Sequence, residues 1–371
     1  MRLVFQVFRY TLANPIGISG GLDKDAEIPD ALFEIGPSIV EVGGTTPLAQ
    51  EGNPRPRVFR IPSQYAMINR YGLNSKGADH MAALLKRRVR KLAYAQGFGL
   101  HDLAEQRVLD GEAGVPPGSL VPGKLLAVQV AKNKSTPDSD IEAIKQDYVY
   151  CVKRLAKYAD TLVVNVSSPN TAGLRDLQAT APLTSILKAV VEAAQSTHRK
   201  TKPAVMVKVS LDEDSDEQTQ GISDAVRRSN VDGVIVGNTT KQRPNPSPDG
   251  WPITPRERET LKETGGYSGP QLFDRTVALV ARYRQLLDNP PTDSESQSNA
   301  TATDESKRKV IFASGGITNG KQALAVLDAG ASIAMMYTGI VYGGVGTVTR
   351  VKQELREEKQ QSKANRIREE R

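Results

Sequence analysis

The sequence of 371 residues has one cysteine, Cys151, three histidines and no apolar run close to the length of a membrane span. A single cysteine excludes an intramolecular disulfide, which suits a compartment where disulfides are not used. The histidines, His80, His101 and His198, lack the spacing of metal ligands, so we expect no metal site. A membrane-crossing helix needs about 20 consecutive apolar residues. We therefore expect a soluble protein without a bound metal.

The net charge of +7 is concentrated in two short stretches, and aromatic residues make up only 5% of the chain. Residues 86–91 carry five bases, and residues 350–371 carry eight bases and five acids. A surface that binds single-stranded nucleic acid would have aromatic side chains among the bases, and neither stretch has one. Both stretches are typical of solvated helix faces. We therefore expect no nucleic-acid partner.

Short apolar runs rich in β-branched residues recur along the chain, and most are followed by a stretch with helical spacing of apolar residues. This alternation is typical of a parallel sheet in an α/β protein. Eight such units predict a (β/α)8 TIM barrel in one domain over residues 1–346. An open doubly wound sheet is the alternative, because repetition does not prove closure. The predicted strands are 15–18, 39–42, 125–130, 162–166, 205–209, 234–236, 310–313 and 333–337, and the clearest helices are 140–158, 183–194 and 319–327.

Four segments depart from this alternation. Residues 97–123 are rich in glycine and proline, and residues 289–309 have almost no apolar side chain. We expect both to be surface insertions, the second of them disordered. Residues 57–75 carry turn signals and predict a hairpin and loop over the mouth of the barrel. Residues 347–371 predict a charged C-terminal helix or tail.

Polar residues and glycines gather where five of the predicted strands end. Each alone could be an ordinary turn former. The carboxyl ends of the strands build the active site of a (β/α)8 barrel, so together they predict one polar site. The residues concerned are Ser19 to Lys24, Lys132 to Lys134, Asn165 to Thr171, Lys208, and Asn238 to Thr240.

Glycines also follow the last two predicted strands, in Ser314-Gly315-Gly316 and Tyr337-Thr338-Gly339. Barrels of this kind hold a phosphate there on backbone N–H groups near a helix N-terminus. We therefore expect a phosphorylated ligand. No GxGxxG motif follows a strand, which argues against a dinucleotide bound in the Rossmann manner.

Four motifs, in order, closely resemble those of the class 2, quinone-dependent and membrane-associated dihydroorotate dehydrogenases. They are residues 14–24 (NPIGISGGLDK), 51–57 (EGNPRPR), 69–75 (NRYGLNS) and 165–175 (NVSSPNTAGLR). The resemblance covers residues 12–344 and implies oxidation of (S)-dihydroorotate to orotate in pyrimidine (UMP) biosynthesis. It further implies FMN as hydride acceptor, ubiquinone as final electron acceptor, and association with the mitochondrial inner membrane. We expect a monomer.

The resemblance also assigns roles to matched positions. Ser168 matches the family's catalytic base, which removes the C5 proton of dihydroorotate while C6 delivers a hydride to the flavin. Lys24 matches a residue near both flavin and substrate, and Lys208 matches the flavin-binding lysine, whose charge suits a reduced, anionic ring. Positions that match substrate contacts are Lys24, Asn69, Arg70, Tyr71, Gly72, Leu73, Asn165, Asn170, Asn238 and Thr239. Positions that match FMN contacts are Gly20, Gly21, Lys24, Gly44, Gln129, Asn165, Lys208, Gly237, Gly269, Gly316, Tyr337 and Thr338.

Three matched positions carry a residue that is uncommon in the family. Gln129 replaces an asparagine, Gly44 a serine or threonine, and Leu73 a phenylalanine. Gln129 keeps the amide, Gly44 can offer its backbone, and Leu73 keeps an apolar shield. We therefore expect tuned activity at these positions.

The N-terminus departs further from the family pattern. Class 2 enzymes precede the barrel with two helices that form the quinone tunnel and contact the membrane, whereas about a dozen residues precede Asn14 here, with no targeting or transmembrane segment. We expect a sequence truncated relative to its gene, with a divergent form as the alternative. One functional alternative is a barrel that binds FMN or orotate without quinone turnover. Another is an FMN barrel for a different substrate.

Overall fold

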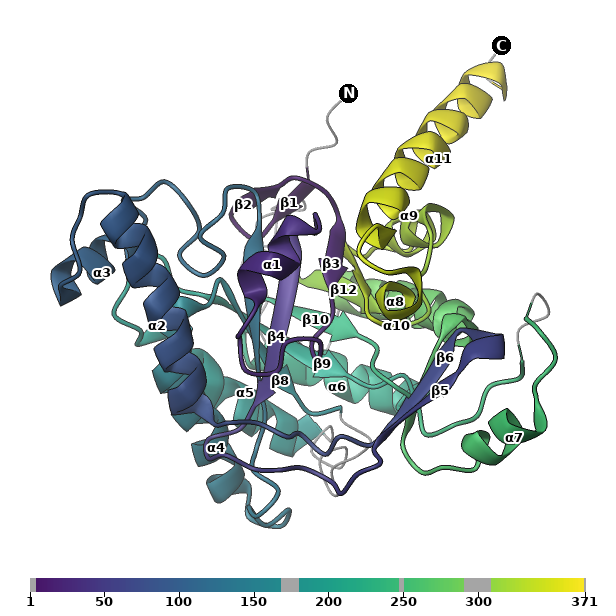
Figure 1. The fold of residues 1–371 in the computed structure, drawn as a ribbon, viewed down its shortest axis with the longest axis horizontal. Coiled ribbons are helices and arrows are strands. Elements are labelled where there is room, and N and C mark those ends of the chain that lie inside the picture. The colour runs from purple at the N-terminus through teal and green to yellow at the C-terminus, as the bar shows by residue number, and fades with distance from the viewer. Residues whose placement is uncertain (1–4, 168–179, 247–249, 290–307, 370–371) are drawn as a thin grey trace.

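The computed structural model describes residues 5–167, 180–246, 250–289 and 308–369, and its centre is a closed barrel of eight parallel strands (Figure 1). Each barrel strand pairs with the next one along the chain, and the last pairs with the first. The predicted (β/α)8 barrel is therefore confirmed. Its strands are β3 (Ile16–Ile18), β4 (Ile39–Thr45), β7 (Leu125–Val130), β8 (Thr161–Asn165), β9 (Ala204–Val209), β10 (Gly233–Val236), β12 (Val310–Ser314) and β13 (Ile333–Met336).

Helices surround the barrel, and several begin at a side chain that caps them (Figure 1). Asp140 accepts from Ala143 N–H, and Asn319 accepts from Gln322 N–H, so each satisfies a free donor of a first helical turn. The predicted helices at 140–158, 183–194 and 319–327 are observed as α4, α5 and α9. The outer helices are α1 (Pro29–Glu34), α2 (Ala78–Ala95), α4 (Ile141–Leu155), α5 (Thr180–Gln195), α6 (Asp216–Arg228), α8 (Phe273–Asp288), α9 (Gly320–Asp328) and α10 (Thr338–Gly343).

The barrel interior is apolar at the end where the strands begin. Ile39, Leu125, Phe312 and Ile333 are buried there, and a hairpin of β1 (Phe5–Val7) and β2 (Tyr10–Leu12) packs against them. Side chains alternate across a strand, so the residue two positions further along points inward one layer higher. We call these four side chains and the hairpin the apolar plug. Because the apolar plug fills the barrel where the strands begin, a ligand can enter the barrel at the opposite, carboxyl end.

Residues 97–123, expected as a surface insertion, contain helix α3 (Asp102–Leu109) packed against α2. Ala104, Val108 and Leu109 are buried in the main core, so this segment is part of the packed structure. Asp160 holds its later part, since its carboxylate accepts from Gly118 N–H at 2.8 Å and from the N–H of the next residue at 2.7 Å. Of the other expected insertion, residues 290–307 lie outside the described residues.

A small antiparallel sheet stands beside the barrel (Figure 1). The predicted hairpin within 57–75 is observed as β5 (Val58–Ile61) and β6 (Ala66–Asn69). A third strand, β11 (Gly266–Ser268), pairs with β6 and was not predicted. The sheet joins two loops that are almost two hundred residues apart in the sequence.

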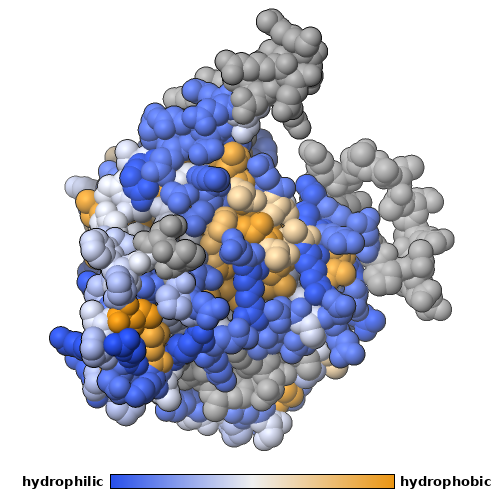
Figure 2. All heavy atoms as spheres, turned by 90° about the vertical axis from the view of Figure 1, so that its right-hand side faces the viewer, coloured by the Kyte–Doolittle hydropathy of each residue, from blue (hydrophilic) through white to orange (hydrophobic). Residues whose placement is uncertain are grey.

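The chain ends in the predicted charged helix, observed as α11 (Thr347–Glu369), which extends away from the barrel (Figure 1). Its first half packs against α9 through Val348, Val351 and Leu355, which are buried at helical spacing. Another short helix, α7 (Pro255–Leu261), lies near β5. No helix within the described ranges is long and apolar enough to cross a membrane. Figure 2 shows an apolar area in the middle of the face that lies to the right in Figure 1.

Candidate active site

A cavity of about 1130 Å³ opens at the carboxyl ends of the barrel strands. Strand ends of the barrel, the β5–β6 hairpin and the loop after it, and the segments after β11, β12 and β13 line it. This volume includes space that is open to solvent, and the lining mixes polar with apolar groups, as sites for a small molecule or cofactor do. The lining residues that the sequence predicted are Gly20, Gly21, Lys24, Gly44, Asn69, Tyr71, Gly72, Leu73, Gln129, Asn165, Lys208, Asn238, Thr239, Gly269, Gly316, Tyr337 and Thr338.

Two predicted residues lie elsewhere. Arg70 points away from the cavity: its guanidinium donates to Glu263 at 2.6 Å and stacks on the Phe59 ring at 4.6 Å. Gly237 does not line the cavity, but a Cβ there would meet the carbonyl oxygen of Ser314 at 1.8 Å. Its φ of 112° also lies in the region that favours glycine. Gly237 thus lets two strand ends approach closely.

Two further predicted residues, Ser168 and Asn170, lie outside the described residues. The last described residue before them is Ser167, which is fully buried at the end of β8. Its N–H and hydroxyl both donate to Asn165 Oδ1, at 3.0 and 3.1 Å. The start of the segment that holds Ser168 is therefore fixed at the edge of the cavity.

A buried ion pair forms the floor of the cavity. Lys208 Nζ donates to both carboxylate oxygens of Glu41, at 3.1 and 3.2 Å, and the two side chains are 5% and 0% exposed. Gly20 N–H donates to Glu41 at 2.9 Å, and the Gln129 amide donates to it as well. A buried carboxylate is tolerated when it is paired and its oxygens are hydrogen-bonded, and both conditions hold here.

Sequence reasoning missed Glu41, because residues 39–42 were taken only as an apolar strand. The signal was present: a single acid in an otherwise apolar run, two positions after Ile39. Ile39 faces the barrel interior, so the alternation of β4 turns Glu41 inward above the apolar plug. Gln129 above Ala127 and Lys208 above Met206 follow the same rule.

Lys24 lies under the aromatic ring of Tyr71, with its Nζ 4.6 Å from the ring centroid. Burial, together with the nearby charges of Arg57 and Lys208, lowers the pKa of Lys24 to about 8, while Asp25 opposes them. The amine is thus close to titration at neutral pH. Of the two lysines that line this wall, Lys208 is paired with Glu41, and Lys24 is the cation that favours an anionic ligand there.

The opposite end of the cavity is built from small hydroxyl residues and glycines. Ser19 and Ser314 hydroxyls are 2.9 Å apart, and Thr338 donates to Ser268 at 2.8 Å. Gly316 is in a left-handed conformation with φ of 73°, and a Cβ there would meet the backbone nitrogen of residue 273 at 2.4 Å. Gly316 therefore lets the backbone after β12 pack closely against the start of α8.

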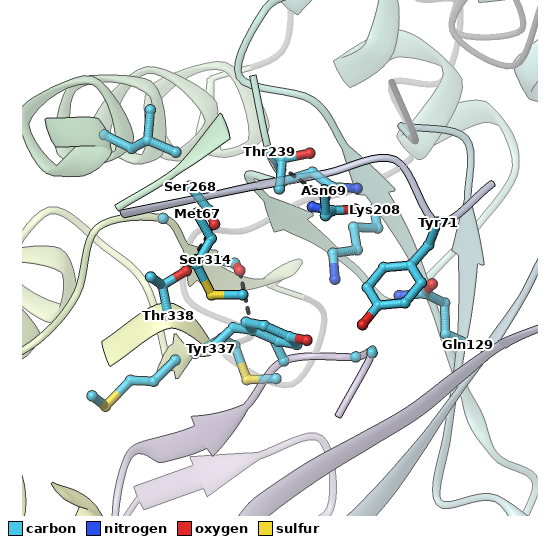
Figure 3. Close-up of a pocket in the computed structure, with 18 of the residues that line it drawn as sticks. Met67, Asn69, Tyr71, Gln129, Lys208, Thr239, Ser268, Ser314, Tyr337 and Thr338 are labelled. Atoms are coloured by element: carbon cyan, nitrogen blue, oxygen red, sulfur yellow. Dashed lines mark hydrogen bonds between the residues drawn. The ribbon is translucent and has the colours of Figure 1, made fainter. Parts of the chain in front are cut away.

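Figure 3 shows these two groups at different sides of the cavity. Tyr71, Gln129 and Lys208 stand on one side, and Ser268, Ser314 and Thr338 on the other. Tyr337 lies between them along one wall, and burial raises its pKa to about 12, so its hydroxyl stays protonated at neutral pH. The cavity thus offers charge and amides at one end and small hydroxyl groups at the other.

Comparison with known proteins gives one consistent family. The family model described as dihydroorotate dehydrogenase matches residues 2–290 and 300–358. The mitochondrial dihydroorotate dehydrogenase (quinone) of Candida glabrata is 37% identical over 95% of this chain and 72% of that protein. The mouse mitochondrial enzyme is 34% identical over 95% and 75%. The crystal structure of Eimeria tenella DHODH in complex with ferulenol has a TM-score of 0.78 at 31% identity, covering 98% of this chain and 86% of that one.

Proposed function

This chain belongs to the dihydroorotate dehydrogenase family and oxidises dihydroorotate to orotate with a flavin and a quinone, and we propose that FMN occupies its cavity and Ser168 is the base. The observation that carries the proposal is the floor of the cavity. There a buried lysine, Lys208, is held by Glu41 beneath a row of amides at the carboxyl ends of the strands.

The residues present fit FMN, as tested on the shape and chemistry of the cavity. Glycines line the wall where a side chain would collide: a Cβ on Gly21 would meet Tyr337 at 3.2 Å, and one on Gly44 would meet Gln129 at 2.8 Å. This leaves a smooth surface for a flat ring. Ser314 and Gly316, at the far end, suit a phosphate bound through backbone N–H groups and hydroxyls.

We assign the flavin ring to the end with Lys208 and Gln129, and the phosphate to the end with Ser314, Gly316 and Thr338. When bound, FMN supplies the two-electron oxidant that takes up the hydride from C6 of dihydroorotate. Lys208 places a positive charge where electron density increases on reduction. Gln129 and Asn165 add amide donors at the same end.

The remaining groups bind and deprotonate the substrate. Lys24 pairs with the substrate carboxylate, and Asn69, Asn165, Asn170 and Asn238 offer donors and acceptors to the two carbonyls and two ring nitrogens of the pyrimidine. Ser168 takes the proton from C5, so that one proton and one hydride leave adjacent carbons. A free hydroxyl is a weak base, so it needs a neighbouring acceptor or water to receive its own proton.

We also propose the electron acceptor, the oligomeric state and the location of the enzyme. Ubiquinone is the quinone, the protein acts as a monomer, and its location is the mitochondrial inner membrane. Several relatives are named mitochondrial, which supports this location. An isoprenoid quinone needs apolar surface, and an apolar area lies on the face shown in Figure 2.

The test uses two portions of the purified protein. Flavin is released from the first portion and identified by chromatography. The second portion keeps its flavin and is titrated anaerobically in two steps. Dihydroorotate should bleach the flavin band, and a short-chain ubiquinone should restore it. Failure to take up FMN on reconstitution would contradict the cofactor assignment. Bleaching without reoxidation by quinone would instead favour a barrel that binds FMN and substrate but does not turn over with quinone.

Affinity for orotate should fall above about pH 8, because the pKa of Lys24 is lowered to about 8 in the free protein. An anionic ligand stabilises the protonated amine. Above this pKa the amine of the free protein is neutral, so binding requires the uptake of a proton from solvent. We expect a constant Kd below this pH and a rise of up to about tenfold per pH unit above it. The measurement is the change in flavin absorbance on adding orotate between about pH 7 and 9.

The matched control is Lys24→Arg, because arginine keeps its charge throughout this range. Its orotate affinity should vary less with pH than that of the parent protein. A parent profile without any break near this pH, or the same break in Lys24→Arg, would remove Lys24 from this role.

A further inference from the structure

Five polar groups along the floor of the cavity form one chain of hydrogen bonds that all donate in the same direction. Thr239 N–H donates to Asn238 Oδ1 at 2.8 Å, and Asn238 Nδ2 donates to Ser167 Oγ at 2.8 Å. The Ser167 hydroxyl donates to Asn165 Oδ1, and Asn165 Nδ2 donates to Gln129 Oε1 at 2.8 Å. The chain crosses the ends of three barrel strands, β10, β8 and β7. Strands β8 and β7 are neighbours, and β9 lies between β10 and β8.

The chain ends at Glu41, which receives the last donor, Gln129 Nε2. A carboxylate can only accept, whereas an amide could be turned end for end to exchange its donor and its acceptor. The backbone N–H of Thr239, at the other end, can only donate. Ser167 N–H also donates to Asn165 Oδ1, so the backbone fixes the Asn165 amide, and Glu41 is the side chain that fixes the far end of the Gln129 amide.

This direction decides what the floor presents to a ligand. Gln129 Nε2 and Asn165 Nδ2 each use one N–H within the chain, so each has a second N–H for the cavity. Lys208 adds an ammonium to the same floor. With the chain reversed, amide oxygens would occupy those places. The floor therefore suits an acceptor edge, such as the carbonyls of a dioxo-pyrimidine.

We propose that Glu41 is a positioning residue that orients the amide of Gln129 with its donor group toward the cavity and holds Lys208 beside it. This inference rests on the proposed function only in naming the ligand edge that the donors meet. Glu41 itself lies under the floor, 0% exposed, and touches no ligand position. Its removal should change both the charge and the donor pattern of the floor.

The test compares Glu41→Gln with the exchanged pair Glu41→Gln/Gln129→Glu. The single variant removes the anion and leaves a residue at 41 that can donate as well as accept. The exchanged pair keeps the total charge and places the carboxylate one strand along, where it accepts from Asn165 in place of the Gln129 amide oxygen. Asp160→Asn is the control for loss of a buried carboxylate away from the cavity, since Asp160 accepts only backbone N–H groups at the base of β8.

Two readouts follow binding and charge without measuring turnover: the Kd of FMN for the apoprotein, from flavin fluorescence, and the midpoint potential of the bound flavin. In Glu41→Gln we expect Kd to rise about tenfold or more, because charged hydrogen bonds are lost from the floor. The potential should move to a more positive value, because the floor loses a negative charge. In the exchanged pair, the potential should return toward that of the parent protein because the charge of the floor is restored, whereas Kd should stay raised because position 129 no longer donates to the cavity.

Parent protein that takes up no FMN would overturn the proposed function itself. Parent protein that binds FMN, together with a Glu41→Gln variant of unchanged Kd and potential, would overturn only the role of Glu41. An exchanged pair that folds but keeps the potential of the single variant would also overturn it. If Glu41→Gln does not fold while the exchanged pair does, the proposal is supported, and failure of both to fold counts against it.

Discussion

Replacing Ser168 with alanine should slow the reduction of the flavin by dihydroorotate by about 10²- to 10⁴-fold, the usual contribution of a general base. FMN and orotate should still bind, because the cavity floor and Lys24 are unchanged. The rate is measured by anaerobic stopped-flow bleaching of the flavin, and orotate affinity by absorbance titration of the same preparation. Unchanged bleaching would remove Ser168 from the base role.

Two neighbouring variants separate proton abstraction from positioning. Ser168→Cys should recover part of the rate and become faster as pH rises toward the thiol pKa of about 8.5, since the thiolate is the stronger base. Ser167→Ala should instead weaken orotate binding, because the Ser167 hydroxyl joins Asn165 to Asn238. If Ser168→Ala lost orotate affinity as Ser167→Ala does, Ser168 would be a positioning residue.

The barrel could be predicted from the sequence because each of its strands is a buried, mostly apolar run that ends in polar or small residues. Such runs are visible without knowing their neighbours; their number favours a barrel over an open sheet, and the strand pairing shows that the barrel is closed. The three short strands outside the barrel that were not predicted are β1, β2 and β11. β11 exists because Gly266 pairs with Asn69 across the cavity wall, and β1 and β2 because they complete the apolar plug. Their cause lies in tertiary contacts.

Within the site, the family motifs located residues but could not tell which face of the chain each side chain occupies. Asn69 and Tyr71 line the cavity, whereas Arg70 between them points to Glu263. Alternation along an extended segment requires this, once one neighbour is known to face the ligand. Glu41 was missed for a different reason: its strand was predicted, but nothing local indicated that its carboxylate faces a lysine 167 residues later.

Residues 97–123 illustrate a different limit. Their glycines and prolines are typical of a loop, and the short helix α3 has only two turns of apolar residues. Ala104 and Val108 lie four positions apart and bury against α2, which a short window cannot distinguish from chance. Composition correctly predicts loops at the two ends of this segment, whereas the helix at 102–109 forms because it packs against α2.

Replacing Lys208 with methionine should lower the FMN affinity of the apoprotein by about 100-fold or more and lower its thermal stability. The substitution removes the cation from the floor and leaves the Glu41 carboxylate buried without its partner. Breaking a buried pair in this way costs about 3–5 kcal/mol. The measurements are the Kd of FMN from flavin fluorescence and the melting temperature of the apoprotein. A variant that binds FMN as the parent does would exclude Lys208 from the flavin site.

The double variant Glu41→Gln/Lys208→Met separates the two consequences, because it removes both charges together. It should recover most of the melting temperature, since no unpaired charge remains in the core. FMN affinity and the rate of flavin reduction should stay low, because the positive charge that favours the reduced flavin is still missing. If the double variant regained FMN affinity and the parent rate of reduction, Lys208 would serve only to neutralise Glu41. If it stayed as unstable as Lys208→Met, the packing of the lysine side chain, and not its charge, would be what stabilises the floor.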